Sequence, residues 1–402
     1  MFELIRANRR RALVLMILMV ALMVGLGYAL GGAFLGSPVT GVGLALVAAF
    51  FIGIGSWYGG DAMILQASGA RRIKHDDHPV LFNIVEEMTI AAGLPKAPEV
   101  YIIDADAANA FATGRDPEHA KIAVTAGLLE RLNRDELQGV IGHEMGHVAN
   151  RDILYMTLAT VMLGAIVMLA DLGVYGVFLG GMGGRRRTSS DGGGQGQMIL
   201  LVVALALMIL APIFAQLLYF ALSRRREYLA DASSALYTRN PEALARALEK
   251  ISSSSVPLPR ANRATAGLYI ANPLKPSKRG LADLTSTHPP ISERVRILRS
   301  MAGEAGFAGY ATAFSQVTGR TVGVKGLGII APGQPDSMPL PAHAEPSLAS
   351  HGERVRASTD ALWRARGYRF IACPCGNTLK APPDFPKNTV ICPNCGREHQ
   401  VK

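Results

Sequence analysis

The stretch VIGHEMGHVANRD, residues 140–152, places two histidines four positions apart, with a glutamate directly after the first. Residues i and i+4 share one face of an α-helix, so His143 and His147 can reach one ion at about 2.0–2.1 Å. Glu144 is rotated by about 100° around the helix and stands beside the metal, where it can take a proton from bound water. A chance match in a chain of this composition has a probability of about one percent. The stretch therefore predicts a catalytic zinc helix.

The third zinc ligand must come from another segment, because a catalytic zinc has three protein ligands and one open position. The stretch SRRREYLADASSAL (223–236) offers Glu227 and Asp231, again four positions apart. A zinc-bound carboxylate and a second carboxylate that orients a ligand histidine are the expected roles of such a pair. We expect Glu227 to bind the metal and Asp231 to hydrogen-bond a ligand histidine. An acidic pair with this spacing is also common on surface helices, so its position in the chain matters.

Four long apolar stretches predict a membrane protein, and hydrophobic residues make up 49% of the 402 residues. Each stretch is long enough to cross a hydrocarbon core of about 30 Å at 1.5 Å per residue. The first could instead be a cleaved signal peptide, but it is longer than the roughly 7–15 residues of a signal sequence core. The stretches are 12–35, 39–58, 153–181 and 198–222.

Basic residues at the ends of these stretches indicate their orientation. Arginines at 9–11 and basic residues at 71–74 place the N-terminus and everything after Gly60 in the cytoplasm, by the positive-inside rule. The net charge of +10 then reflects contact with an anionic membrane leaflet, and nucleic acid is not an expected partner. The arginines at 185–187 conflict with the same rule, so residues 153–222 either cross as a hairpin or form a membrane-embedded fold-back.

Either arrangement returns the chain to the membrane face that it left. His147 lies six residues before the third stretch, and Glu227 lies five residues after the fourth. On continuous helices these separations are about 9 Å and about 8 Å. The two ligand segments therefore meet at the base of the second hairpin, where a membrane-embedded substrate could present an unfolded segment.

A small sheet is expected in the soluble part of the chain. PEVYIID (98–104) combines β-branched and aromatic residues and predicts a strand. ANAFATG (108–114) is small and polar, ends in glycine, and suits an exposed edge strand. NPEALARALEKI (240–251) predicts a capped amphipathic helix.

The four cysteines all lie in the last thirty residues, within CPCGNTLKAPPDFPKNTVICPNCG (373–396). A Cys-x-Cys and a Cys-x-x-Cys, each followed by glycine, resemble the two knuckles of a zinc ribbon. Four thiolates leave no open position, so we expect a structural zinc distinct from the catalytic one; a disulfide pair or a redox Cys-x-Cys are the alternatives. The ribbon could recognise substrate, bind a regulator or contact nucleic acid. Its cysteines are Cys373, Cys375, Cys392 and Cys395.

HEMGH, EYLAD, NAFATG and THPPISERV (287–295), in register with the apolar stretches, resemble the HtpX-type membrane zinc metalloproteases, relatives of the CAAX prenyl proteases. The resemblance covers roughly residues 1–300 and implies an inner-membrane endopeptidase, with a cytoplasmic zinc site, that degrades damaged or misassembled membrane proteins. It implies that His143, His147 and Glu227 are the zinc ligands and Glu144 the general base.

The same resemblance implies further site residues. An extended substrate would add to an edge strand containing Asn109, Ala110 and Phe111 by main-chain hydrogen bonds. His288 and Arg294 are candidates for stabilising the oxyanion of the transition state. The alternative is a Pro-Pro turn that starts a helix on which Arg294 pairs with a carboxylate.

We therefore predict an α-helical integral membrane protein with a mainly helical zincin-like protease domain, a small β-sheet and a C-terminal zinc ribbon. The predicted function is zinc-dependent cleavage of misfolded or damaged membrane proteins at the cytoplasmic face of the inner membrane. A catalytically silent membrane scaffold and a dedicated processing protease are the alternatives. The expected partners are the lipid bilayer, unfolded polypeptides and a regulator at the ribbon. The expected segments are a first membrane hairpin (1–60), the first part of the protease domain (61–152), a second hairpin (153–222), the second part of the protease domain (223–300), a linker and region of unknown role (301–370) and the ribbon (371–402).

Overall fold

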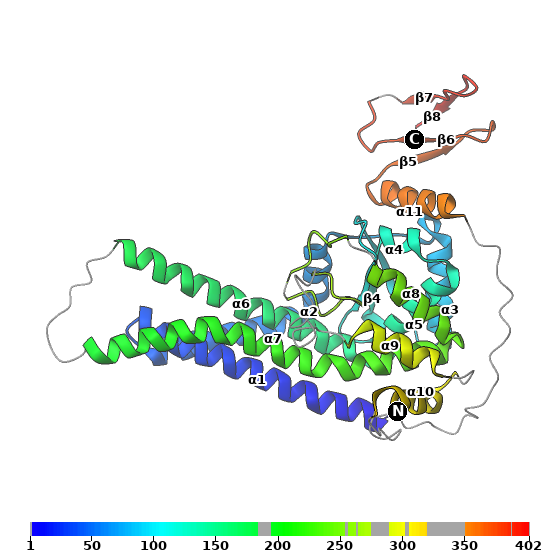
Figure 1. The fold of residues 1–402 in the computed structure, drawn as a ribbon. Coiled ribbons are helices and arrows are strands. Elements are labelled where there is room, and N and C mark those ends of the chain that lie inside the picture. Colours follow the sequence, from blue (N-terminus) through cyan, green and yellow to red (C-terminus); the bar gives the residue numbers. More distant parts are fainter. Residues whose placement is uncertain are drawn as a thin grey trace.

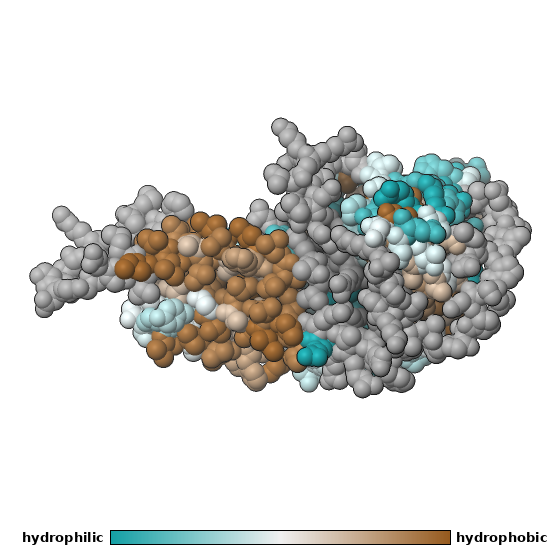
Figure 2. Space-filling view, turned by 60° about the horizontal axis from the view of Figure 1, so that its bottom comes forward, coloured by the Kyte–Doolittle hydropathy of each residue, from teal (hydrophilic) through white to brown (hydrophobic). Residues whose placement is uncertain are grey.

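Among the residues that the computed structural model describes, four helices are long and apolar enough to cross a membrane: α1 (Phe2–Phe34), α2 (Pro38–Ser68), α6 (Asp152–Gly183) and α7 (Gly194–Thr238). They extend together from one side of the remaining elements (Figure 1). Figure 2 shows a hydrophobic surface over this end of the molecule, which exposed side chains such as Leu13, Phe50 and Ile209 supply. The structure describes residues 2–183, 194–253, 256–262, 264–274, 289–301, 305–319, 350–386 and 388–401, so the arginines at 185–187 lie outside the described residues.

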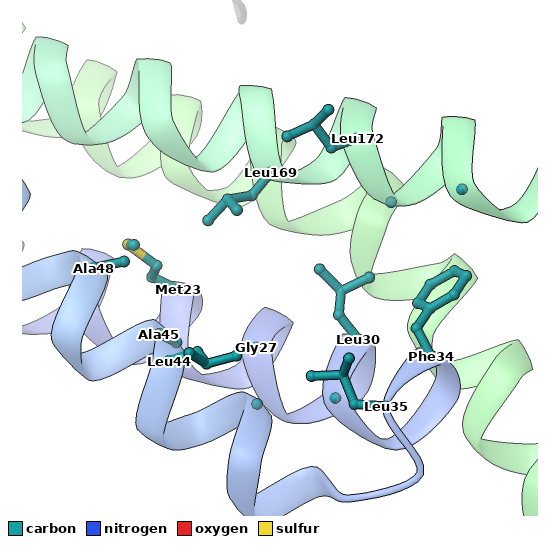
Figure 3. A pocket seen from close by; sticks show the side chains of 14 residues that line it. Met23, Gly27, Leu30, Phe34, Leu35, Leu44, Ala45, Ala48, Leu169 and Leu172 are labelled. Atoms are coloured by element: carbon teal, nitrogen blue, oxygen red, sulfur yellow. The ribbon is translucent and has the colours of Figure 1, made fainter.

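The helices α1 and α2 form a tight hairpin because glycines let their backbones touch. A Cβ atom at Gly41 would lie 2.0 Å from the carbonyl oxygen of Gly27, so no side chain fits there. Towards the turn of the hairpin, α1 and α2 separate from α6 and leave an apolar cavity of about 520 Å³ (Figure 3). Leu30, Leu169 and Leu172 are among the side chains that line it.

The predicted small sheet is present, with the strand order β1-β2-β4-β3. Its central strands β2 and β4 run parallel, and the outer strands β1 and β3 pair antiparallel with them. The predicted strand at 98–104 is β2. The bounds are β1 (Ala70–Arg72), β2 (Glu99–Ile103), β3 (Ala110–Thr113) and β4 (Lys121–Thr125).

The strand β3 is the edge of this sheet, as predicted, but the expectation that it is exposed is wrong. All four of its residues are buried. The Oγ1 atom of Thr157 on α6 lies 2.9 Å from the Oγ1 atom of Thr113, and the amide of Ile270 donates to the carbonyl of Ala110 over 2.9 Å. Tertiary contacts from two distant segments thus cover an edge that its composition marks as open.

Helices surround the sheet and enclose the core of the soluble part. The predicted amphipathic helix at 240–251 is α8, and its apolar face is buried against this core. The helices and short 3-10 turns are η1 (His75–Asp77), α3 (Pro79–Ala91), η2 (Pro117–His119), α4 (Ala126–Arg131), α5 (Arg134–Ala149), α8 (Pro241–Ser253), α9 (Ile291–Arg299) and α10 (Phe307–Thr318).

The C-terminal region packs on the soluble part through α11 (His351–Ala365), which lies against α4 (Figure 1). The hydroxyl of Ser358 donates to the carboxylate of Glu130 over 2.9 Å, and Ala361 is fully buried. Within the expected linker at 301–370 the described residues thus include α10 and α11, whereas residues 320–349 lie outside them. After α11 come two antiparallel hairpins, β5 (Arg369–Ala372) with β6 (Thr378–Ala381) and β7 (Thr389–Ile391) with β8 (Glu398–Gln400).

Candidate metal centre and active site

The helix α5 carries the histidine pair and begins with a capping box. The side chain of Asn133 accepts from the amide of Glu136, and the Glu136 carboxylate accepts from the amide of Asn133. Two glycines of the motif then allow a close approach to α7. A Cβ atom at Gly146 would lie 3.1 Å from the Cα atom of Ala230, and one at Gly142 would lie 3.2 Å from the Oγ atom of Ser234. The glycines of GHEMGH therefore set the spacing between the two helices that carry the site.

The helix α7 brings Glu227 to the two histidines. The Oε2 atom of Glu227 lies 3.6 Å from Nε2 of His143, and its Oε1 atom lies 3.4 Å from Nε2 of His147. The candidate ligand atoms of the three residues all lie within 4.8 Å of one another, and all three side chains are buried. A single ion can therefore reach both imidazoles and the carboxylate.

The donor set fits a zinc ion. Two imidazole nitrogens and one carboxylate oxygen are ligands that zinc takes in catalytic sites. Within the described part of the chain, the buried Nε2 atom of His143 has no hydrogen-bond partner. Burial lowers the pKa of His147, but hydrogen bonds with Asp152 and Glu227 outweigh burial and raise that pKa to about 10. The carboxylates around this imidazole thus favour positive charge, which a bound cation would supply.

A carboxylate faces the second ring nitrogen of each histidine. The Oδ1 atom of Asp231 lies 3.0 Å from Nδ1 of His143, and the Oδ2 atom of Asp152 lies 3.4 Å from Nδ1 of His147. A carboxylate that accepts the Nδ1 proton holds the ring in the tautomer whose Nε2 lone pair faces the metal. The structure thus brings Asp231 to His143, one of the two predicted ligand histidines. The role of Asp152 escaped the sequence analysis, although a charged residue just before an apolar stretch and five residues after His147 is a usable signal.

The carboxylate of Glu144 is held in the same buried space. Glu144 is 1% exposed, and neither of its oxygens has a hydrogen-bond partner among the described residues. Burial raises the pKa of Glu144 above the ordinary value of 4.5. A general base works best when its pKa lies near the working pH, so this environment suits a carboxylate that accepts a proton during the reaction.

Arg294 on α9 is fully buried and binds the acidic residues of α7. Its Nε and Nη2 atoms donate to the two carboxylate oxygens of Asp231 over 2.8 and 2.6 Å. Its Nη1 atom lies 3.3 Å from Oε2 of Glu227 and donates to the carbonyl of Ile270 over 3.1 Å. Burial would raise the pKa of Asp231, but the Arg294 guanidinium and His143 outweigh it, and the net pKa is lowered. Arg294 therefore pairs with carboxylates. The other residue predicted beside it, His288, lies outside the described residues.

The three residues of the predicted substrate strand are buried, and the side chain of Asn109 already has hydrogen-bond partners within the protein. The side-chain amide of Asn109 donates to the carbonyl of Ala271 over 2.9 Å. Its oxygen accepts from the amide of Ala271 over 3.3 Å. Ala110 and Phe111 are both 0% exposed.

The four cysteines of the tail form a second cluster. Their sulfurs lie 3.4 Å apart for Cys373 and Cys375, 3.4 Å for Cys373 and Cys395, and 3.7 Å for Cys375 and Cys392. Sulfurs placed 2.3 Å from the centre of a tetrahedron are about 3.8 Å apart. All four cysteines are free thiols, so no disulfide pair is formed among them. The cluster is compatible with a zinc ribbon.

A buried HExxH helix, a glutamate on the extension of a membrane helix and four apolar helices define a membrane-bound metallopeptidase. The chain belongs to peptidase family M48, whose family model matches residues 77–302. It is 44% identical over 301 residues to a "Protease HtpX homolog" of Dictyoglomus thermophilum, covering 75% of this chain and 94% of that protein. A "Protease HtpX homolog" of Syntrophobacter fumaroxidans is 45% identical over 296 residues, which are 73% of this chain and 99% of that one.

Among solved structures, the crystal structure of S. mikatae Ste24p is similar over 73% of this chain and 66% of that chain, with 17% identity and a TM-score of 0.38. A similarity this low supports no conclusion. The close relatives and the family confirm the resemblance to the HtpX-type proteases, and the chain is a membrane-bound metalloendopeptidase. The catalytically silent scaffold is not favoured. The family model ends at residue 302, before α10, α11 and the cysteine hairpins.

Proposed function

We propose that the enzyme uses Zn²⁺ to cleave misfolded or damaged membrane proteins at the cytoplasmic face of the inner membrane. The observation that carries this proposal is the convergence of His143, His147 and Glu227 at the base of two apolar helices. The apolar span of α6 begins at Asp152, and that of α7 ends at Tyr219. Glu227 is eight residues beyond Tyr219, which is about 12 Å along a helix. A polypeptide segment leaving the bilayer is therefore within reach of the site.

The residues of the site divide the chemistry between them. A bound zinc would supply Lewis acidity towards the scissile carbonyl and would lower the pKa of attacking water. Glu144 accepts the proton of that water on its carboxylate and passes it to the departing amine. Asp231 and Asp152 hold the protons on Nδ1 of the two histidines. Arg294 lowers the pKa of Asp231 and holds both Asp231 and Glu227 in place.

A main-chain interaction would orient the substrate. Ala110 and Phe111 lie on the edge strand β3, which packs against the zinc helix α5, and Asn109 directly precedes this strand. An extended polypeptide bound to such an edge is recognised through its backbone, so many sequences can be accepted. That breadth suits removal of damaged proteins better than a processing protease with one narrow substrate.

We also propose that Cys373, Cys375, Cys392 and Cys395 bind a second, structural zinc ion. The two hairpins turn at glycines with positive φ, 87° at Gly376 and 70° at Gly396, which direct each cysteine pair towards the other. The helix α11 fixes this zinc ribbon to the protease domain. A regulator or a substrate is the partner that we propose for this ribbon.

The test compares the wild-type enzyme with the Glu144→Gln variant, both purified in detergent under chelation. Zinc content and cleavage of a permanently unfolded polypeptide, carboxymethylated α-lactalbumin, are followed while zinc is restored. We expect equal zinc binding by both proteins and cleavage by the wild type alone. Cleavage by the variant at the wild-type rate would remove Glu144 from the mechanism. Zinc binding by both without any cleavage would contradict the broad backbone recognition of unfolded polypeptides.

A further inference from the structure

A segment without helix or strand lies buried in the soluble part: residues 265–271, TAGLYIA, here called the strap. All seven residues are buried, and Tyr269 and Ile270 are each 1% exposed. Irregular segments usually run over the surface, because their backbone polar groups need water when no ladder satisfies them. The strap must therefore find its hydrogen-bond partners inside the protein.

Those partners lie on the edge strand β3 and on Asn109, which directly precedes it. The amide of Ile270 donates to the carbonyl of Ala110 over 2.9 Å. The side chain of Asn109 binds both main-chain groups of Ala271, donating to its carbonyl over 2.9 Å and accepting from its amide over 3.3 Å. The bond from Ile270 to Ala110 is a main-chain bond of the kind that an extended peptide makes when it adds to a sheet edge, and the Asn109 side chain adds two bonds to the next residue of the strap. The strap thus fills a position that receives a peptide backbone.

The same segment reaches the metal centre. The carbonyl of Ile270 accepts from Nη1 of Arg294 over 3.1 Å, and that nitrogen lies 3.3 Å from a carboxylate oxygen of the ligand Glu227. A peptide carbonyl of the enzyme itself is therefore bound by the guanidinium that contacts the ligand set.

Other contacts anchor the strap. The ring of Tyr269 meets that of Phe111 edge to face at 5.1 Å, and its hydroxyl lies 3.2 Å from Oγ of Ser68 at the end of α2. Gly267 lies against α7 so closely that a Cβ atom there would be 2.0 Å from the ring of Tyr219. The strap is thereby held between β3 and two membrane helices.

We propose that the strap is an internal occupant of the substrate position on β3, and that a polypeptide is cleaved only after it displaces the strap. On displacement, the amide of Asn109 binds the backbone of the substrate in place of Ala271, and Nη1 of Arg294 becomes available to a substrate carbonyl. This inference rests on the proposed function, because it concerns the regulation of the same site. When a site is open for only a fraction of the time, its apparent Kd equals the Kd of the open site divided by that fraction. The strap therefore raises KM and leaves kcat unchanged.

The first test is hydrogen exchange in the full-length Glu144→Gln variant, in detergent with Zn²⁺, with and without carboxymethylated α-lactalbumin. We expect the polypeptide to increase deuterium uptake in the fragment that contains Ile270 and Ala271. Uptake at Ala110–Thr113 should stay low, because the substrate replaces the strap there. Binding of the polypeptide with unchanged protection of the strap would overturn the proposal. Absence of any binding would instead contradict the proposed function.

The second test is Tyr269→Phe, which removes one hydroxyl and keeps the ring against Phe111. Loss of one such hydrogen bond should increase strap exchange by about fivefold. KM for the polypeptide should fall by up to the same factor, while kcat is unchanged. The matched control is Tyr101→Phe, since the Tyr101 hydroxyl donates to Glu99 over 3.0 Å within strand β2, which β4 separates from β3. Faster hydrogen exchange in Tyr269→Phe with an unchanged or increased KM would overturn the proposal, because the strap would then stabilise the fold without competing with substrate.

Discussion

Replacing Asp152 by asparagine tests whether this carboxylate, and not helix packing alone, orients His147. The substitution keeps a side-chain oxygen beside Nδ1 and removes the negative charge. Loss of a carboxylate behind a ligand histidine typically costs about 10- to 100-fold in metal affinity. The distance of 3.4 Å between Oδ2 of Asp152 and Nδ1 of His147 is near the limit of a hydrogen bond. We therefore expect the lower end, about tenfold, which corresponds to about 1.4 kcal/mol.

Zinc affinity of Asp152→Asn is measured by competition with a chromophoric chelator on the full-length enzyme in detergent. The matched control is Asp116→Asn, because Oδ1 of Asp116 lies 2.7 Å from Nδ1 of His119 in an exposed pair outside the site. The control should keep wild-type zinc affinity. An affinity of Asp152→Asn within twofold of the wild type would refute the reasoning and would assign the orientation of His147 to the packing of α5 alone.

Three further predictions concern the stability of the protease domain and the tail. Arg294→Met leaves the buried carboxylate of Asp231 without its cation, which costs about 3–5 kcal/mol of folding free energy. The melting temperature should therefore fall far more than in the control Arg299→Met, which loses an exposed arginine. Equal melting temperatures of the two variants would contradict the pairing of Arg294 with Asp231. The Nδ1 atom of His78 accepts from the amide of Leu81, and burial lowers the pKa of His78 below 6.5. Because the unfolded chain takes up a proton at about pH 6.5 that the native state does not bind, stability should decrease as the pH falls through 6.5. His78→Asn keeps the cap and should flatten this dependence of the melting temperature; an unchanged slope would assign it to other groups. Cys392→Ser should reduce the number of zinc ions bound per chain from two to one, as measured by metal analysis. Cleavage in the polypeptide assay should be unchanged. Two bound zinc ions in this variant would contradict the ribbon site.

Local spacing predicts much of the metal centre. The prediction of His143, Glu144 and His147 depends only on the period of a single α-helix. Glu227 could be predicted because the second membrane hairpin returns the chain to its starting face. The structure brings His143, His147 and Glu227 together. Short-range periodicity and a topological constraint were sufficient, since neither depends on how distant side chains pack.

The rest of the site depends on contacts between segments far apart in the sequence. Arg294 meets Asp231 across 63 positions, and Asn109 meets Ala271 across 162. The composition of residues 108–114 predicts an open edge strand. This prediction is wrong because composition does not show which distant segment of the chain will cover that edge. The pairing of Arg294 was one of two alternatives, since an arginine near an active site serves equally well as an ion-pair partner or as a donor to substrate. Only the packing of α9 against α7 distinguishes them.

The continuity of the helices links membrane insertion to assembly of the active site. The helix α7 runs without interruption from its apolar span to Glu227 and Asp231. On the other side, α5 ends at Ala149 and α6 begins at Asp152, with Arg151 between them at a positive φ of 58°. This tight corner sets Asp152 behind His147. A shift of either membrane helix along its axis would therefore carry a ligand or its orienting carboxylate out of position. Since both helices are long and apolar enough to cross a membrane, assembly of the metal centre is coupled to the packing of α6 against α7.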